Sequence, residues 1–206
     1  FWAQANPAGH LTRLAYAGQE VEEIEAAAGA SHVQAAVGFA ASAEKVRSMN
    51  WSRFGIVHFA THAFLNPVQP DLSNILLSQF DAAGHPQAGA LWFSDIASMR
   101  MPVDLVVLSA CQTANGDQLP GEGLVGLSYS FLIAGSRRVV GSLWDVDDAA
   151  TAELMRRFYE ALYRGGQSPA EALRSAQRAI AMVPRWSNPY YWAGFTIEGN
   201  PDPIPR

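Results

Sequence analysis

Three short, largely apolar runs limit the folds open to this chain. They are FGIVHFAT at residues 54–61, VDLVVLS at residues 103–109 and RVVGSLW at residues 138–144. Runs of this length without regular polar alternation are typical of strands buried on both faces, which occur in parallel sheets covered by helices. The sequence therefore predicts that these three runs form the core of one sheet.

The segments between and after these runs carry helix signals. Residues 148–164 place apolar side chains on one face, and residues 124–134 form an apolar segment that stops at Gly135. Ser168 followed by Pro169 is typical of the start of a last helix. Weaker strand signals lie at residues 32–39, 75–77, 90–93 and 190–197. Alternating strands and helices predict an α/β fold, a mostly parallel central sheet with helices on both faces.

Composition excludes several classes of protein. The chain is 49% hydrophobic and 16% charged, which provides for a sizeable core and argues against global disorder. Its net charge of −5 argues against nucleic-acid binding, which needs a basic face. No apolar run reaches the roughly 18 residues of a membrane span, and the start lacks a signal-peptide pattern. A single cysteine leaves no internal disulfide or cysteine-cluster zinc site and suits a reducing, cytoplasmic setting.

We expect one domain over residues 1–206, because the sequence shows neither an internal repeat nor a long linker. Residues 1–10 are predicted to form an arm and residues 200–206, with three prolines, an irregular tail. Since the first residue is Phe1 rather than methionine, we expect the chain to be excised from a larger protein.

Reactive side chains follow two of the predicted strands. Residues 54–61 run directly into His62, and residues 103–109 are followed by Ala110 and Cys111. If these strands are parallel neighbours, both side chains emerge at one sheet edge, where α/β proteins bind ligands. An imidazole beside a thiol generates the nucleophilic thiolate and later protonates a leaving amine. The backbone N–H groups of Ala63 and Cys111 are candidates for an oxyanion hole.

Less specific interpretations compete with this one. A lone cysteine at a strand end is often a small core residue, and a histidine there is often a packing residue. His58 and His62 would lie roughly 13 Å apart along a strand, so we assign no metal, and His58 is expected to pack or to support the site from behind. The acidic residues Glu20, Glu22, Glu23 and Glu25 predict one solvated helix face.

Four segments in order resemble the CHAT family, whose members are caspase-like protease domains often found behind tetratricopeptide repeats in bacteria. They are VHFATHA around His62, VVLSACQTANGD around Cys111, GEGLVGLSYSFLIAGSRRVVGSLWDVDD and PYYWAGFTIEG. The resemblance implies a caspase-like three-layer α/β sandwich and hydrolysis of peptide bonds. It makes His62 the general base and acid, and Cys111 the nucleophile. The separation of the two residues is close to that in caspases.

The segment SLWDVDD also resembles the corresponding part of separase, in which an acidic residue helps to form a pocket for arginine. The resemblance implies that Asp145 or Asp148, beside Trp144, binds a basic substrate side chain. Two positions depart from related patterns: Ala63, where many relatives have glycine, and Ser109, where metacaspases have aspartate.

Together these features predict a cysteine endopeptidase that cleaves a partner protein after a basic residue, without a cofactor. The resemblance further implies regulation by a tetratricopeptide-repeat region or an activating partner. The alternative is a catalytically silent caspase-like module that serves as a scaffold in a signalling assembly.

Overall fold

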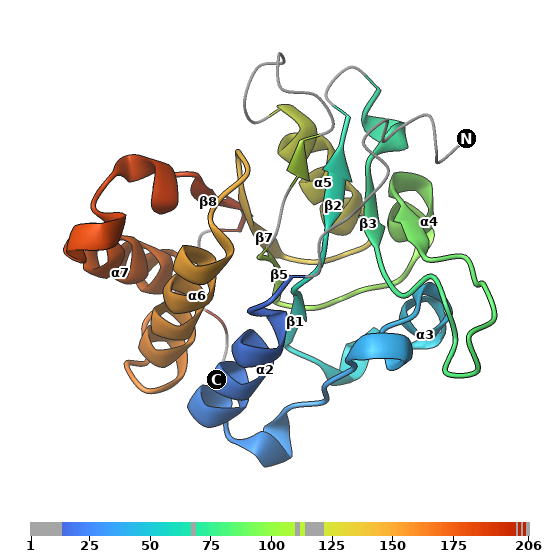
Figure 1. Ribbon diagram of the computed structural model, residues 1–206, viewed down its shortest axis with the longest axis horizontal. Helices are drawn as coiled ribbons and strands as arrows, with labels where there is room; N and C mark the ends of the chain where they lie inside the picture. The colour runs from blue at the N-terminus through green and yellow to red at the C-terminus, as the bar shows by residue number, and fades with distance from the viewer. Residues whose placement is uncertain are drawn as a thin grey trace.

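The central sheet of the computed structural model has the strand order β1-β5-β7-β8 (Figure 1). The strands are β1 (Ile56–Phe59), β5 (Leu105–Leu108), β7 (Arg138–Ser142) and β8 (Phe195–Gly199). The structure describes residues 14–66, 69–109, 112–113, 122–200, 202 and 204. β1, β5 and β7 are parallel, and β8 pairs antiparallel to β7 at the edge. The predicted mostly parallel sheet is confirmed, with one antiparallel edge strand.

β5 lies in the middle of this arrangement because every one of its side chains is apolar. All four of its residues are buried, and its register places Leu105 opposite Ile56 of β1. Alternate side chains of a strand point to opposite faces of the sheet. Val106 and Leu108 accordingly join one hydrophobic cluster, and Leu105 and Val107 join another.

The first cluster lies between the sheet and helices α3 (Ala43–Ser48), α4 (Phe93–Ser98) and α5 (Glu122–Ile133). Phe131 of α5 is fully buried, and its ring centroid lies 5.6 Å from that of Phe59 in β1. The apolar run predicted as a helix thus packs directly on the sheet.

The second cluster lies under α2 (Ala17–Ala28), α6 (Asp148–Tyr163) and α7 (Pro169–Ala181), on the other side of the sheet (Figure 1). The starts of α6 and α7 follow the expected signals. Asp147 caps α6 by accepting a bond from the Ala150 N–H at 2.8 Å. Ser168 and Glu171 form a capping box at the start of α7. Helices therefore cover both faces, an arrangement compatible with a caspase-like fold.

A second, smaller sheet extends from the carboxyl ends of β1 and β5. Its order is β4-β3-β2-β6, with β4 (Ala90–Trp92), β3 (Asn74–Leu76), β2 (Ala63–Leu65) and β6 (Gln112–Thr113). The sequence predicted β3 and β4 but not β2 and β6. β2 follows His62 directly, and β6 follows Cys111 in the sequence.

Two strand predictions need correction. Residues 32–39 form no strand; the chain there has short 3₁₀ turns at Ala30–His32 and Gly38–Ala40, and Val37 is 58% exposed. Of residues 190–197, only those from Phe195 onward are in a strand, because Pro189–Tyr191 form another 3₁₀ turn. β-branched residues alone do not make a strand where no neighbouring backbone is available for pairing.

The ends of the chain are described only in part. The predicted arm, residues 1–10, lies outside the described residues. In the tail, the carbonyls of Asn200 and Asp202 accept bonds from the buried guanidinium of Arg138 at 3.0 and 2.8 Å.

Candidate functional site

His62 lies at the junction between β1 and β2, where the chain leaves the central sheet for the smaller one. The residue is 8% exposed, and its carbonyl accepts a bond from the Leu76 N–H at 2.8 Å. The Thr61 hydroxyl also donates to the Leu76 carbonyl, so β3 fixes the backbone on this side of His62. Hydrogen bonds to Leu76 of β3 therefore hold this junction in place.

Ala63 stands where glycine would be needed if the backbone were left-handed. Its backbone does not have a positive φ, and the residue is buried and paired with Ile75 across β2 and β3. Alanine therefore occupies this position without strain, and it retains the N–H that an oxyanion hole would use.

Cys111 lies outside the described residues, but the chain is described up to Ser109 and again from Gln112. The Ser109 N–H donates to the Phe59 carbonyl at 3.2 Å, which extends the pairing of β5 with β1 by one step. Beyond the gap, Gln112 pairs in parallel with Phe64. The sequence predicts that β1 and β5 are neighbours, and the structure shows them parallel and adjacent. Their carboxyl ends therefore lie at one edge of the sheet.

Asp145 follows β7, and its carboxylate lies close enough to His62 to be affected by it electrostatically. Partial desolvation by the surrounding protein raises the pKa of the Asp145 carboxyl above its ordinary value of 3.8, and the nearby His62 acts in the opposite direction. The residue as a whole is still exposed to solvent. The side chain that follows β1 thus influences the carboxyl that follows β7.

The other residues predicted for substrate binding make structural contacts. Asp148 accepts a bond from the Tyr16 N–H at 3.1 Å, which ties the start of α2 to the start of α6. The Trp144 indole N–H donates to the Tyr190 carbonyl at 2.9 Å. A Cβ on Gly194 would lie 2.7 Å from the Trp144 ring, so glycine is needed for this close approach. Trp144 is half-buried and held beside Asp145.

A buried polar cluster beneath the strand ends was not predicted. The Glu20 carboxylate of α2 accepts a bond from the Ser109 hydroxyl at 2.8 Å and contacts His58 Nε2 at 3.2 Å. His58 Nδ1 lies 3.0 Å from the Tyr159 hydroxyl of α6. The expectation of a fully solvated acidic face is wrong for Glu20, which is only 4% exposed. Its position four residues before Ile24, on the apolar face of the helix, was the signal in the sequence.

The expected supporting role of His58 is consistent with this cluster. Among the described residues, no group of three or more His, Cys, Asp or Glu side chains is arranged to hold a metal ion. In the same part of the chain, no helix is both long and apolar enough to cross a bilayer.

Comparison with known proteins places the chain in a family. Over 107 residues it is 38% identical to mouse tetratricopeptide repeat protein 28, an alignment that covers 52% of this chain and 4% of that protein. The human protein of the same name is 29% identical over 196 residues, covering 81% of this chain and 8% of the relative. The chain thus spans less than a tenth of the length of these relatives, and both are animal proteins, so they give no support to a bacterial setting. The CHAT domain matches residues 3–200. This chain belongs to the CHAT domain family, which is associated with caspase-like cysteine peptidases.

Proposed function

We propose that the chain is a cysteine endopeptidase that uses Cys111 as nucleophile and His62 as general base and acid. The observation that carries the proposal is the parallel pairing of β1 and β5, whose carboxyl ends lead into His62 and toward Cys111. The pairing of Phe64 with Gln112 beyond both residues supports it. Family membership supplies the chemistry expected of such a pair.

The proposed reaction has two halves. The Cys111 thiolate attacks the carbonyl carbon of a peptide bond, and the electron pair of the C=O moves to oxygen, where the amides of Ala63 and Cys111 stabilise it. The C–N bond then breaks, and the imidazolium of His62 donates its proton to the leaving amine. In the second half, His62 removes a proton from water, which attacks the thioester and releases the thiolate and the carboxylic acid product.

Asp145 is our candidate for recognition of a lysine or arginine that precedes the cleaved bond. The residue as a whole is exposed and its carboxyl lies within the electrostatic reach of His62, whereas the Asp148 carboxylate already accepts a backbone bond from Tyr16. Half-buried Trp144 beside it offers an apolar wall for the aliphatic part of the substrate side chain. The substrate would be a partner protein, and the repeat-protein names of the relatives favour control by an adjoining tetratricopeptide-repeat region.

Replacement of the proposed nucleophile tests this function directly. Proteolysis should be measured with a library of fluorogenic peptides and with candidate protein substrates, using this chain alone and in its natural full-length polypeptide. We expect Cys111→Ala and His62→Ala each to reduce cleavage by about a thousandfold or more, while the circular dichroism spectrum stays unchanged.

The matched control is Ser130→Ala, which removes a buried hydroxyl that bonds the Leu127 carbonyl within α5. This variant should cleave like the wild type. Undiminished proteolysis by Cys111→Ala would overturn the proposal. A wild-type protein without cleavage in both forms would instead support the scaffold function.

A further inference from the structure

The buried cluster around Glu20 connects two layers of the molecule, the central sheet and the helices α2 and α6 that cover one of its faces. Glu20 comes from α2, His58 from β1 and Tyr159 from α6, while Ser109 is the first residue after β5. The Ser109 hydroxyl also lies 3.4 Å from the Phe59 carbonyl. Polar groups of this kind are costly to bury unless each finds a partner. In this cluster each of the four side chains has at least one such partner.

The hydrogen-bond geometry admits one fully satisfied proton arrangement. In that arrangement the Ser109 hydroxyl and the Nε2–H of His58 face Glu20 Oε2, and the Tyr159 hydroxyl faces His58 Nδ1, the His58 tautomer being the one assigned from these contacts. Burial, the largest effect, raises the pKa of Tyr159 well above its usual value, so its hydroxyl stays protonated and can donate. A doubly protonated His58 would instead leave the Tyr159 proton without an acceptor within this cluster. A network with one satisfied arrangement fixes its members in position.

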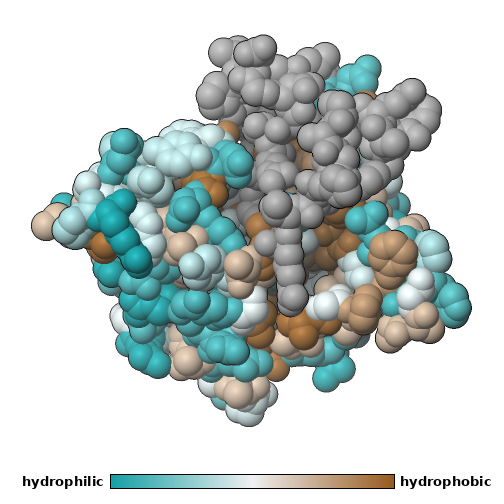
Figure 2. Space-filling view, in the orientation of Figure 1, coloured by the Kyte–Doolittle hydropathy of each residue, from teal (hydrophilic) through white to brown (hydrophobic). Residues whose placement is uncertain are grey.

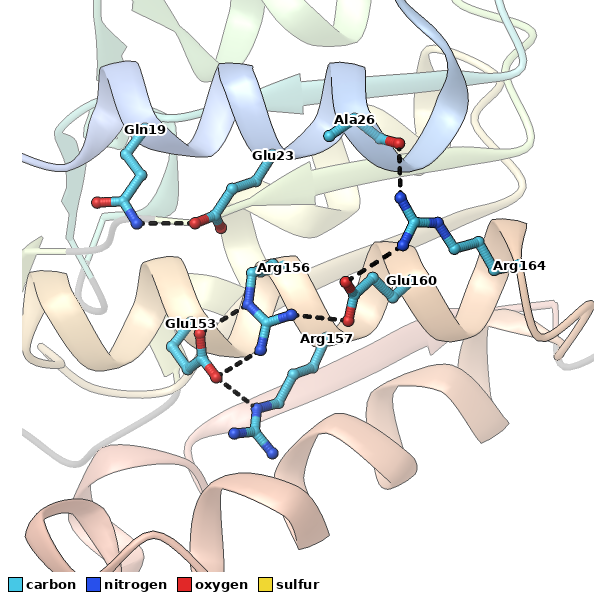
Figure 3. Close-up of polar contacts among 8 residues, drawn as sticks. All are labelled: Gln19, Glu23, Ala26, Glu153, Arg156, Arg157, Glu160 and Arg164. Carbon is cyan, nitrogen blue, oxygen red and sulfur yellow. Dashed lines mark hydrogen bonds and ion pairs between the residues drawn. The ribbon is translucent and has the colours of Figure 1, made fainter.

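The position of Glu20 is in turn set by how α2 lies on α6. The Arg164 guanidinium donates to the Ala26 carbonyl at 2.9 Å, near the end of α2 (Figure 3). At the other end, the Tyr16 N–H donates to Asp148 at 3.1 Å. Glu20 projects from between these two contacts toward Ser109. Any shift of α2 along α6 would therefore move the acceptor of the Ser109 hydroxyl.

Ser109 is the last described residue before Cys111, which follows two positions later in the sequence. We infer that Glu20 is a positioning residue. By accepting the hydrogen bond of the Ser109 hydroxyl, its carboxylate fixes the position of the residue that follows β5. The position of α2 on α6 thereby affects the reactivity of Cys111. This inference rests on the proposed function of Cys111. A hydrophobic residue at position 20 would fill the same space at lower cost, but it could not hold the serine hydroxyl.

The single cysteine of the chain makes the coupling measurable without a substrate. The rate of alkylation by iodoacetamide near neutral pH reports the thiolate of Cys111 alone. We expect Ser109→Ala and Glu20→Gln to slow alkylation by about tenfold, as small misplacements of reactive groups do. They should lower kcat for a cleaved peptide by the same factor and leave KM within about twofold. Glu20→Ala, which also removes the acceptor oxygen, should have the larger effect.

Ser130→Ala is the matched control, since it removes a hydroxyl bond of 2.7 Å at an equally buried serine outside the cluster. Thermal unfolding should show similar midpoints for Ser109→Ala and Ser130→Ala, so that a difference in thiol reactivity cannot come from lost stability. Equal alkylation rates in these two variants would overturn the inference, whether or not the wild type cleaves peptides. A slower rate only in Ser109→Ala and the Glu20 variants, in a protein that cleaves nothing, would sustain the coupling while overturning the protease function.

Discussion

Asp145 and His62 illustrate how single residues from distant parts of the chain share one environment. Asp145 follows β7 and His62 follows β1, yet the field of His62 acts on the Asp145 carboxyl. Desolvation is the larger influence on this carboxyl and disfavours its charged form. A cationic substrate side chain would stabilise the charged carboxylate of Asp145, as expected of a pocket for lysine or arginine.

Replacement of this residue gives the first prediction. We expect Asp145→Asn to reduce kcat/KM for substrates with arginine before the cleaved bond by about a hundredfold, the scale of a charge-assisted pair. Substrates with leucine there should change far less. The measurement is kcat/KM for matched peptides. Asp148→Asn is the control, because it removes a carboxylate that bonds Tyr16, and it should leave the arginine preference intact. Loss of the arginine preference in Asp148→Asn but not in Asp145→Asn would instead assign the pocket to Asp148.

The same residue predicts a pH dependence. The pKa of Asp145 is raised above 3.8, so its carboxylate gains a proton at a higher pH than an ordinary aspartate. The preference for arginine over leucine should therefore decline earlier on acidification. A preference that is constant down to the ordinary pKa would contradict the assignment, and Asp145→Asn should show no such decline.

At the scale of elements, α2 and α6 carry charged side chains whose hydrogen bonds are not equally complete. Within α6, Arg156 bonds Glu153 at 2.6 Å and Glu160 at 2.8 Å, so these pairs join residues of one helix (Figure 3). The space-filling view shows mainly hydrophilic residues on the left of the molecule, the side on which α6 and α7 lie (Figure 2). Glu23 of α2 differs from these pairs: Gln19 donates to one of its oxygens, and the other is buried without a hydrogen bond.

Glu23 therefore weakens the folded state at neutral pH. Burial raises its pKa above the ordinary value of 4.5 and outweighs the attraction of Arg156 and the bond from Gln19. For an acid whose pKa is higher in the folded state, the stabilising effect is complete below the unfolded pKa and is lost as pH rises through the folded value. We expect Glu23→Gln to increase the free energy of unfolding near neutral pH, with the difference vanishing below 4.5. Urea denaturation at several pH values measures this.

The neighbouring Glu22 is exposed and provides the control. Glu22→Gln should leave the free energy of unfolding nearly unchanged at every pH. An equal response of the two variants would show that the effect comes from the overall charge of the helix rather than from burial of the Glu23 carboxylate.

At the scale of the whole molecule, two hydrophobic cores share one sheet. Phe131 of α5 belongs to the core on one face and Phe158 of α6 to the core on the other, and both are fully buried. Neighbouring residues of β5 contribute to both cores, because alternate side chains point to opposite faces. Loss of either core would leave β5 covered on one side only.

This arrangement predicts cooperative unfolding. Phe131→Ala and Phe158→Ala should each lower the free energy of unfolding by about 3–5 kcal/mol, the cost of a cavity at a buried aromatic ring. Each variant should still unfold in a single transition by both circular dichroism and tryptophan fluorescence. Separate transitions, with each variant affecting only one of them, would show that the two cores fold independently.

The elements predicted correctly are those whose signal lies within a few neighbouring residues. The apolar residues of β5, the cap at Ser168 and the stop at Gly135 each follow from local backbone and burial preferences. The order of His62 and Cys111 after two strands of this kind also predicted one shared sheet edge, because parallel strands end on the same side.

What only the tertiary structure decided involves partners far apart in the chain. β2 and β6 are strands because each finds a neighbouring backbone to pair with, and residues 32–39 are not, because they find none. Glu20 is buried because Ser109 and His58 lie where its helix meets the sheet. The periodicity of a sequence records which face of an element is apolar, but it does not record which polar groups the opposite element will present. That pairing is fixed only when the elements pack.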